Sequence, residues 1–167
     1  PWDLVIGHSL GGAAVTLAAA DNPTWTRRLV LIDPGLRITD GERGAVRSSQ
    51  DEAFMDVTVD DVRRNNPRWH EQDLELKALS SRQVSRWAVA ETDIQNPDWD
   101  ARAAAAALRI PTHIIGADPA VFSIFTADLA AEVCTNPHIT MSVVENAGHS
   151  PHRDRPDETL RQLFAAL

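Results

Sequence analysis

The chain has 167 residues, of which 43% are hydrophobic and 24% are charged, and this is typical of a globular protein with one sizeable core. Its formal net charge of −8 argues against a nucleic-acid partner, because phosphate binding needs clustered Lys and Arg side chains. The single cysteine, Cys134, excludes an internal disulfide framework, and no Cys or His spacing indicates a structural metal site.

The sequence lacks signals for membrane insertion or export. Its longest weakly polar run, residues 101–110, contains Arg102 and Arg109 and is too short to span a bilayer. The first six residues lack the basic and apolar regions of a signal peptide. We therefore expect a cytoplasmic protein that does not bind membranes.

Short apolar runs alternate with helix-forming segments towards both ends of the chain. The expected strands are residues 4–6, 29–32, 112–115 and 139–144. The expected helices between and after them are residues 11–20, 126–134 and 156–167. Strands that alternate with helices indicate a parallel sheet with crossover helices, so the predicted fold class is α/β.

Residues 36–109 interrupt this alternation and are expected to form a helical lid or cap insertion. The α/β core is then expected at residues 1–35 and 110–167. An insertion of about 74 residues far exceeds the dozen or so that a parallel crossover needs. Surplus chain on this scale is either a packed subdomain or a disordered loop, and the helical signals favour packing.

The insertion contains signals for at least two helices. Thr58 and Asp61 have the spacing of a capping box at the start of a short helix. A longer helix is indicated by apolar side chains with the spacing of one helical face, which are Leu76, Leu79, Val84 and Trp87.

Three of the five tryptophans, Trp69, Trp87 and Trp99, belong to the insertion. In one interpretation they fill a small core between the insertion and the sheet. In the other, at least one of them lines an apolar substrate pocket. Both interpretations remain open from the sequence.

The pentapeptide Gly7-His8-Ser9-Leu10-Gly11 stands between the first expected strand and the first expected helix. It matches the G-x-S-x-G pattern, in which small residues let the chain turn sharply and lift the serine hydroxyl towards solvent. Neither the lysine of a phosphate-binding loop nor the G-x-G-x-x-G pattern of a dinucleotide site occurs here. Ser9 is therefore the candidate nucleophile, and His8 beside it is expected to pack nearby or to line the substrate pocket.

A serine hydroxyl needs a base within hydrogen-bond reach and a third group that fixes the tautomer of the base. Among the six histidines, His149 lies directly beyond the last expected strand, at the edge where parallel sheets present catalytic groups. His113 lies inside an expected buried strand and is interpreted as a hydrogen-bonded core residue. His152 follows three residues after His149, but no carboxylate cluster supports a metal pair there. We therefore expect His149 to be the base.

Two aspartates can supply the orienting acid. Asp118 follows the third expected strand and Asp33 follows the second, so both lie at the required sheet edge. Both also give the chain order Ser, Asp, His that such sites use. Asp118 is the preferred candidate, and the alternative interpretation of Asp33 is a turn residue that caps its own backbone.

The serine turn of the pentapeptide, called the nucleophile elbow, is followed along the chain by the acid and the histidine. In this arrangement the whole chain resembles the α/β-hydrolase superfamily, and the insertion matches its lid domain by position. A serine at the elbow is similar to esterases, lactonases, carbon–carbon bond hydrolases and cofactor-free haloperoxidases. Haloalkane dehalogenases and epoxide hydrolases differ because their elbow bears an aspartate. The resemblance implies a catalytic set of Ser9, Asp118 and His149 and no cofactor.

The resemblance also implies elements that precede the elbow. Members of the superfamily have several strands there, and a loop among them supplies one oxyanion-hole amide. This sequence begins in the elbow strand, so we expect an upstream chain or segment to complete the fold, with the Leu10 backbone N–H as one oxyanion donor. Many members have two residues between the strand-ending glycine and the aspartate, whereas Ala117 alone separates Gly116 from Asp118.

The expected activity is hydrolysis of an ester, lactone or related acyl bond in a small apolar molecule, through an acyl-enzyme on Ser9. His8, Trp69, Trp87 and Trp99 are the candidate substrate-binding residues. Two other functions stay open: a receptor-like protein that uses the pocket for ligand recognition, and a catalytically silent fragment.

Overall fold

The computed structural model describes residues 1–39, 41, 43–44, 47–48, 51 and 57–167. It divides into two compact units. The core unit comprises Pro1–Arg37 and Asp100–Leu167, and the helical unit comprises Ile38–Trp99. The core unit is therefore larger than the expected ranges of 1–35 and 110–167, because the chain up to Arg37 and from Asp100 to 109 belongs to it.

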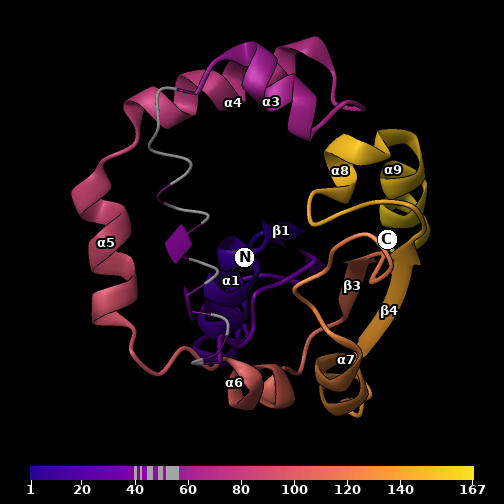
Figure 1. Cartoon of the computed structure of the whole chain (residues 1–167). Helices are drawn as coiled ribbons and strands as arrows, with labels where there is room; N and C mark the ends of the chain where they lie inside the picture. Colours follow the sequence, from indigo (N-terminus) through magenta and orange to yellow (C-terminus); the bar gives the residue numbers. More distant parts are fainter. Residues whose placement is uncertain (40, 42, 45–46, 49–50, 52–56) are drawn as a thin grey trace. The chain divides into compact units, whose positions relative to one another are not determined.

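The core unit contains a parallel sheet in the described part of the chain (Figure 1). Its strands lie in chain order and are β1 (Val5–His8), β2 (Leu29–Ile32), β3 (Thr112–Ala117) and β4 (Ile139–Val144). Each strand pairs in parallel with the next one along the chain. This arrangement confirms the predicted α/β fold.

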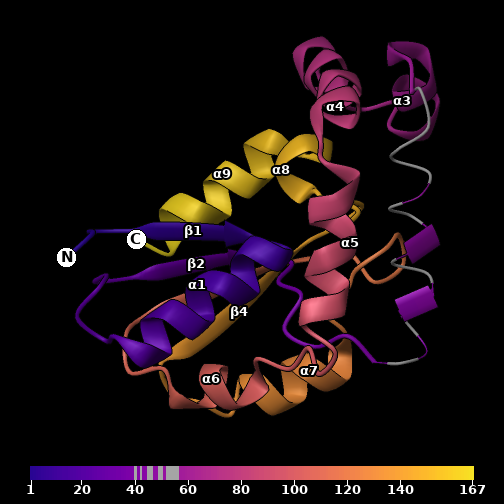
Figure 2. The ribbon, with the colours of Figure 1, turned by 90° about the vertical axis from the view of Figure 1, so that its left-hand side faces the viewer.

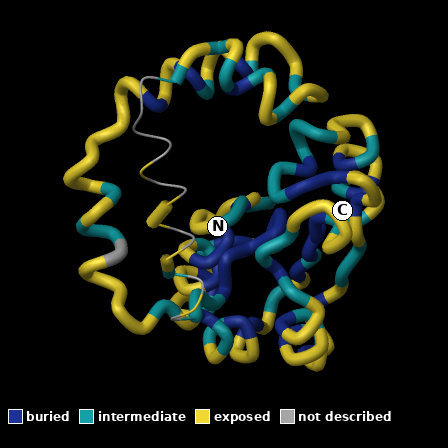
Figure 3. The backbone as a smooth tube through the Cα atoms, in the orientation of Figure 1, coloured by how far each residue is buried: buried dark blue, intermediate teal, exposed yellow. Residues whose placement is uncertain are grey.

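Helices cover both faces of this sheet. One side carries α8 (Pro151–Asp154) and α9 (Pro156–Ala165), and the other carries α1 (Leu10–Asp21), α6 (Arg102–Ala107) and α7 (Ala127–Val133) (Figure 2). Burial on both faces explains why β2 is a continuous apolar run rather than an alternating one. All four residues of β2 are buried, as are all residues of β3 except His113, and Figure 3 shows the buried positions of the chain in dark blue.

His113 on β3 is half-buried rather than a core residue, and its ring is hydrogen-bonded, as expected, here to two side chains of β4. Its Nδ1 lies 2.8 Å from Thr140 Oγ1, and its Nε2 lies 2.9 Å from Ser142 Oγ. Ser142 in turn donates to Gln162 Oε1 on α9 at 2.7 Å. Burial lowers the pKa of His113 below its ordinary value.

The two ends of the helical unit leave and re-enter the core unit at one point. Arg37 and Asp100 form an isolated antiparallel bridge. Beside it, the Ala101 N–H donates to the Leu36 carbonyl oxygen at 2.6 Å. Residues 100–109 join the core unit because α6 packs against α1 there and buries Ala105.

The described helices of the helical unit are α3 (Val59–Asn65), α4 (Glu71–Gln83) and α5 (Arg86–Gln95). The capping box predicted at Thr58 and Asp61 is present, with Thr58 at the N-cap of α3. Val62, Leu74 and Ala78 form a small buried cluster of this unit, and Trp69 packs against that cluster.

The helical face predicted from Leu76 to Trp87 is wrong in two respects. Ser85 ends that periodicity, because its side chain accepts from the Ala88 N–H and starts a separate helix, α5. The buried residues of α4 are Leu74, Ala78 and Ser81, whereas the predicted residues Leu76, Leu79, Val84 and Trp87 are exposed.

No helix in the described parts of the chain has the length and apolar character needed to cross a membrane. Likewise, the described residues include no group of three His, Cys, Asp or Glu side chains that could hold a metal ion.

The two glycines that open α1 provide a matched test of packing. A Cβ on Gly12 would lie 2.7 Å from Pro34 Cβ, whereas a Cβ on Gly11 would meet no described atom within 4 Å. Both Gly→Ala changes gain helix propensity, and overpacking typically costs about 1–3 kcal/mol. We expect Gly12→Ala to lower the free energy of unfolding in urea relative to Gly11→Ala, which should be neutral or stabilising. Equal stabilities of the two variants would contradict this packing.

Candidate active site

Ser9 lies at the turn between β1 and α1, with backbone angles φ 54° and ψ −123°. Its N–H donates to the Ile32 carbonyl oxygen at 3.1 Å, and its own carbonyl accepts from Gly12 and Gly35. Gly7 makes the turn possible, because a Cβ there would lie 2.6 Å from the Gly11 carbonyl oxygen. The sequence motif thus forms the expected strand, tight turn and helix.

His149 joins Ser9 to a carboxylate. Its Nε2 lies 2.9 Å from Ser9 Oγ, and its Nδ1 lies 2.7 Å from Asp33 Oδ2. A carboxylate only accepts hydrogen bonds, so Nδ1 carries the proton and Nε2 can accept from the Ser9 hydroxyl. The structure therefore brings together Ser9, His149 and Asp33 in one continuous hydrogen-bonded chain.

Asp33 follows β2 directly and is fully buried. Besides His149, its carboxylate accepts from Ser123 Oγ at 2.6 Å, from the Ile124 N–H at 3.1 Å and from the Ala117 N–H at 3.2 Å. Burial alone would raise the pKa of Asp33, but the bonds from His149, Ser123 and Ile124 outweigh it and lower that pKa. Asp33 is therefore a buried carboxylate kept ionised by its donors.

The preferred acid of the sequence analysis was Asp118, but the aspartate that lies within hydrogen-bond distance of His149 is the alternative, Asp33. The Asp118 carboxylate accepts instead from the backbone N–H groups of Asn146 and Ala120, each at 2.8 Å. These two bonds lower the pKa of Asp118. The reason is the register of the strands. The last residue of β2, Ile32, pairs with Ile115, but β3 continues for two more residues to Ala117. Asp118 therefore lies further along the strand direction than Asp33, which follows β2 directly.

A signal for this correction was present in the sequence. The short spacing from Gly116 to Asp118 departs from the common pattern of the superfamily, and Asp33 keeps the same chain order. Asp33 is not a turn residue that caps its own backbone, because its side chain bonds distant residues such as His149.

His8 and Leu10, the neighbours of Ser9, have different surroundings. His8 Nε2 lies 2.7 Å from the His149 carbonyl oxygen, and burial lowers the pKa of His8. Leu10 is the first residue of α1, so its N–H has no intrahelical acceptor and is available to an oxyanion. The oxyanion role of Leu10 and the substrate contact of His8 stay predictions.

Apolar side chains that the sequence analysis missed lie beside these groups. Phe122 is 59% exposed, and its ring meets that of His149 edge-on with centroids 6.1 Å apart. A Cβ atom placed on Gly35 would lie 3.4 Å from Ile124 Cδ1 and 3.7 Å from the Ser9 carbonyl carbon, so Ile124 lies near the Ser9 turn. The sequence could have indicated these two side chains, because they lie in the segment after β3, at the carboxyl edge of the sheet.

The three tryptophans predicted to bind substrate all belong to the helical unit. Trp69 packs on the buried cluster of that unit, which supports its interpretation as a core residue. Trp87 is 71% exposed. The Trp99 carbonyl oxygen accepts from the Ile38 N–H at 3.1 Å. Contact of any of these side chains with a substrate stays a prediction.

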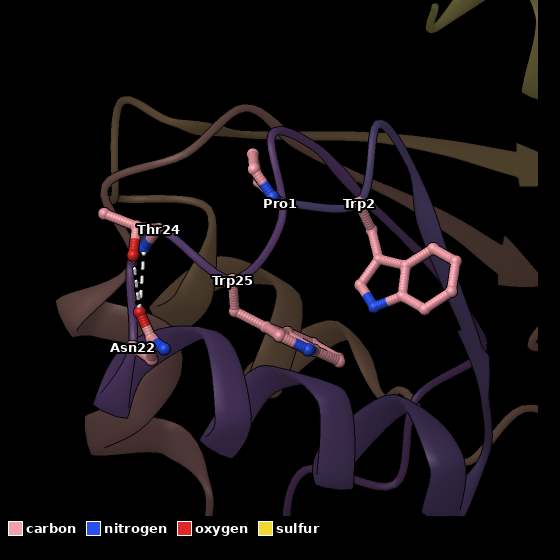
Figure 4. Close-up of a pocket in the computed structure, with 5 residues that line it drawn as sticks. All are labelled: Pro1, Trp2, Asn22, Thr24 and Trp25. Atoms are coloured by element: carbon pink, nitrogen blue, oxygen red, sulfur yellow. Dashed lines mark hydrogen bonds between the residues drawn. The ribbon is translucent and has the colours of Figure 1, made fainter.

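A separate shallow pocket lies at the other end of β1 (Figure 4). It is lined by Pro1, Trp2, Asn22, Thr24 and Trp25. The Asn22 side chain accepts from both the backbone N–H and the hydroxyl of Thr24 in this pocket. Because Trp2 precedes β1 and Ser9 follows it, this pocket is not part of the Ser9 site.

Comparisons with known proteins agree with this geometry. A sequence model described as Alpha/beta hydrolase family matches residues 3–162. The parallel sheet and the serine turn define an α/β protein of the hydrolase type. The chain belongs to the alpha/beta hydrolase family. No curated protein matches the sequence at a significant level.

Several solved structures share the fold. N-formylmaleamic acid deformylase from Pseudomonas putida is 23% identical, with a TM-score of 0.71 over 96% of this chain and 65% of that one. E-2-(acetamidomethylene)succinate hydrolase is 21% identical, with a TM-score of 0.75 over 98% of this chain and 66% of that one. An N-acyl homoserine lactone degrading enzyme is 15% identical, with a TM-score of 0.70 over 99% and 68%. The chain thus spans about two thirds of the length of these proteins.

Substitution of the two aspartates by asparagine should affect the reactivity of Ser9 to very different extents. Asp33→Asn should slow the reaction of Ser9 with a fluorophosphonate probe by roughly 10³–10⁴-fold, because a carboxamide no longer fixes the tautomer of His149. Asp118→Asn should slow it by no more than about tenfold, since it alters hydrogen bonds to backbone N–H groups only.

The measurement is the labelling rate of each variant, with its unfolding transition recorded as the control for folding. A larger loss in Asp118→Asn than in Asp33→Asn would return the role of the acid to Asp118.

Proposed function

We propose that the chain forms the catalytic part of a serine hydrolase that cleaves an ester, lactone or related acyl bond through an acyl-enzyme on Ser9. The observation that carries this proposal is the hydrogen-bonded chain from Asp33 through His149 to Ser9 Oγ, with distances of 2.7 and 2.9 Å. In this proposal, the turn at Ser9 is the nucleophile elbow, and the three residues are the catalytic triad.

Each proton in the reaction has a defined place. Ser9 Oγ attacks the substrate carbonyl carbon while its proton moves to Nε2 of His149, which gives a tetrahedral intermediate. The resulting imidazolium donates this proton to the leaving group as the acyl bond breaks, which leaves an acyl group on Ser9. Water then attacks the acyl-enzyme, His149 takes one of its protons, and Ser9 regains that proton as the acid leaves.

Asp33 supports both protonation steps of His149. Its ionised carboxylate lies 2.7 Å from Nδ1, where it holds the ring and stabilises the imidazolium. The carboxylate is fully buried, so water does not screen this attraction. Three further donors to the carboxylate keep it charged and fixed in place.

The oxyanion of the tetrahedral intermediate needs backbone donors. The Leu10 N–H at the start of α1 is one donor, and the partial positive charge at this helix end adds to it. The second donor is expected from an upstream segment or chain that pairs with β1. Support for this comes from β1, which is an edge strand of the described sheet and leaves Ile6 exposed.

The substrate is expected to be a small molecule with an apolar group next to the scissile bond. Support comes from the exposed Phe122 ring beside His149 and from Ile124 near the Ser9 turn. Structurally similar proteins include a deformylase, a lactone-degrading enzyme and an esterase, all of which are named for acyl chemistry. In this proposal, the helical unit acts as a lid that selects among such substrates.

Ser9 provides the direct test of this function. We expect the folded chain, alone or within a longer polypeptide that contains it, to hydrolyse short p-nitrophenyl esters steadily and to react with a fluorophosphonate at Ser9. Ser9→Ala should abolish both signals, and Ser80→Ala, at an exposed position of α4, is the matched control that keeps them.

Two outcomes would reject the proposal. Tight binding of such esters without turnover would indicate a receptor-like function. A folded chain with neither turnover nor labelling would indicate a catalytically silent protein.

The tryptophans of the helical unit should separate into a core residue and a substrate residue. Trp69→Ala should lower the free energy of unfolding by about 1–3 kcal/mol, because it opens the cluster around Leu74. Trp87→Ala removes an exposed side chain, so it should keep stability. The proposed role of the helical unit as a lid leads us to expect that this variant changes KM or ester preference. Unchanged kinetics in Trp87→Ala would exclude a role for this side chain in substrate binding.

A further inference from the structure

His8 lies between the nucleophile turn and the loop that carries the base. Its ring contacts the ring of His149 with centroids 4.7 Å apart and the ring of His152 with centroids 4.8 Å apart. Its Nε2 lies 2.7 Å from the carbonyl oxygen of His149. A carbonyl oxygen only accepts, so His8 Nε2 carries a hydrogen and donates it.

This bond closes a small ring of interactions around the reacting atoms. Ser9 bonds the His149 side chain through Oγ, and the preceding residue, His8, bonds the His149 main chain. Two consecutive residues of the turn, His8 and Ser9, therefore hold one residue that lies 141 and 140 positions away from them along the chain. Because both the main chain and the side chain of His149 are held, the loop after β4 does not set the distance from His149 Nε2 to Ser9 Oγ by itself.

We propose that His8 is a positioning residue, which fixes His149 against Ser9 through its hydrogen bond to the His149 carbonyl. This inference rests on the proposed function, since positioning matters only if His149 acts on Ser9. Misplacement of a reacting group by about 1 Å can cost roughly 100-fold in rate, so this one bond can influence turnover without any contact with substrate.

The charge of His8 suits this position. The titratable or charged groups that face it are His149, His152, Asp33 and Arg153. Burial lowers the pKa of His8, so its ring is neutral near pH 7 and still keeps the Nε2 hydrogen that it donates. A neutral neighbour leaves His149 free to become an imidazolium, whereas a cation at this distance would oppose that charge.

Two variants separate the hydrogen bond from the bulk of the side chain. His8→Phe keeps a planar ring but removes the donor, and His8→Gln keeps an amide N–H donor of similar reach. We expect His8→Phe to lower kcat for p-nitrophenyl esters by about 10- to 100-fold with KM unchanged, and His8→Gln to stay within about threefold of the wild type. His113→Phe is the matched control and should leave kcat of the folded protein unchanged, because the half-buried His113 ring bonds Thr140 and Ser142 rather than Ser9 or His149.

A second readout does not depend on turnover. Backbone hydrogen exchange of residues 146–149 should become faster in His8→Phe than in His8→Gln, while the exchange of β2 stays the same in both. Equal kcat and equal loop exchange in the two variants would overturn the proposal. If the wild type lacks esterase activity, the proposed function fails, and the exchange experiment still decides whether His8 holds the loop.

Discussion

The rest of the site depends on the hydrogen bonds that the buried carboxylate of Asp33 accepts. Four groups from separate parts of the core unit donate to it: the Ala117 and Ile124 N–H groups, the Ser123 hydroxyl and the His149 ring. A buried carboxylate without donors would be strongly destabilising. The ends of β2 and β3, the segment after β3 and the loop after β4 that carries His149 must therefore meet at one point, and this places His149 next to Ser9.

Backbone strain accumulates at the same edge of the sheet. The non-glycine residues with positive φ in the described structure are Ser9 at 54°, Asp33 at 37° and Asn146 at 58°. Each follows a strand at its carboxyl end, and such a conformation typically costs about 1–3 kcal/mol. Packing and hydrogen bonds around each residue offset this cost. The chain thus tolerates unfavourable backbone geometry where it presents side chains for chemistry.

The sequence was sufficient to predict the parallel sheet, because its strands are continuous apolar runs buried on both faces. It also indicated that Ser9 and His149 lie close together, because Ser9 follows β1 directly and His149 lies in the loop after β4, at the same edge of the sheet. The preference for Asp118 over Asp33 did not match the observed hydrogen bond, because that choice depends on how far β3 extends beyond β2. The face of α4 was missed for a related reason: its buried side chains, Leu74, Ala78 and Ser81, include a small and a polar residue that apolar periodicity does not reveal.

The junction between the two units has a consequence for how such a protein can diversify. The bridge between Arg37 and Asp100 and the bond from Ala101 to Leu36 hold the entry and exit of the helical unit together. Since loop-closure entropy grows only slowly with length, segments of very different size can be exchanged between these fixed ends at small cost. Asp33 and His149 lie outside the exchanged segment, so such an exchange leaves the hydrogen-bonded chain from Asp33 to Ser9 intact.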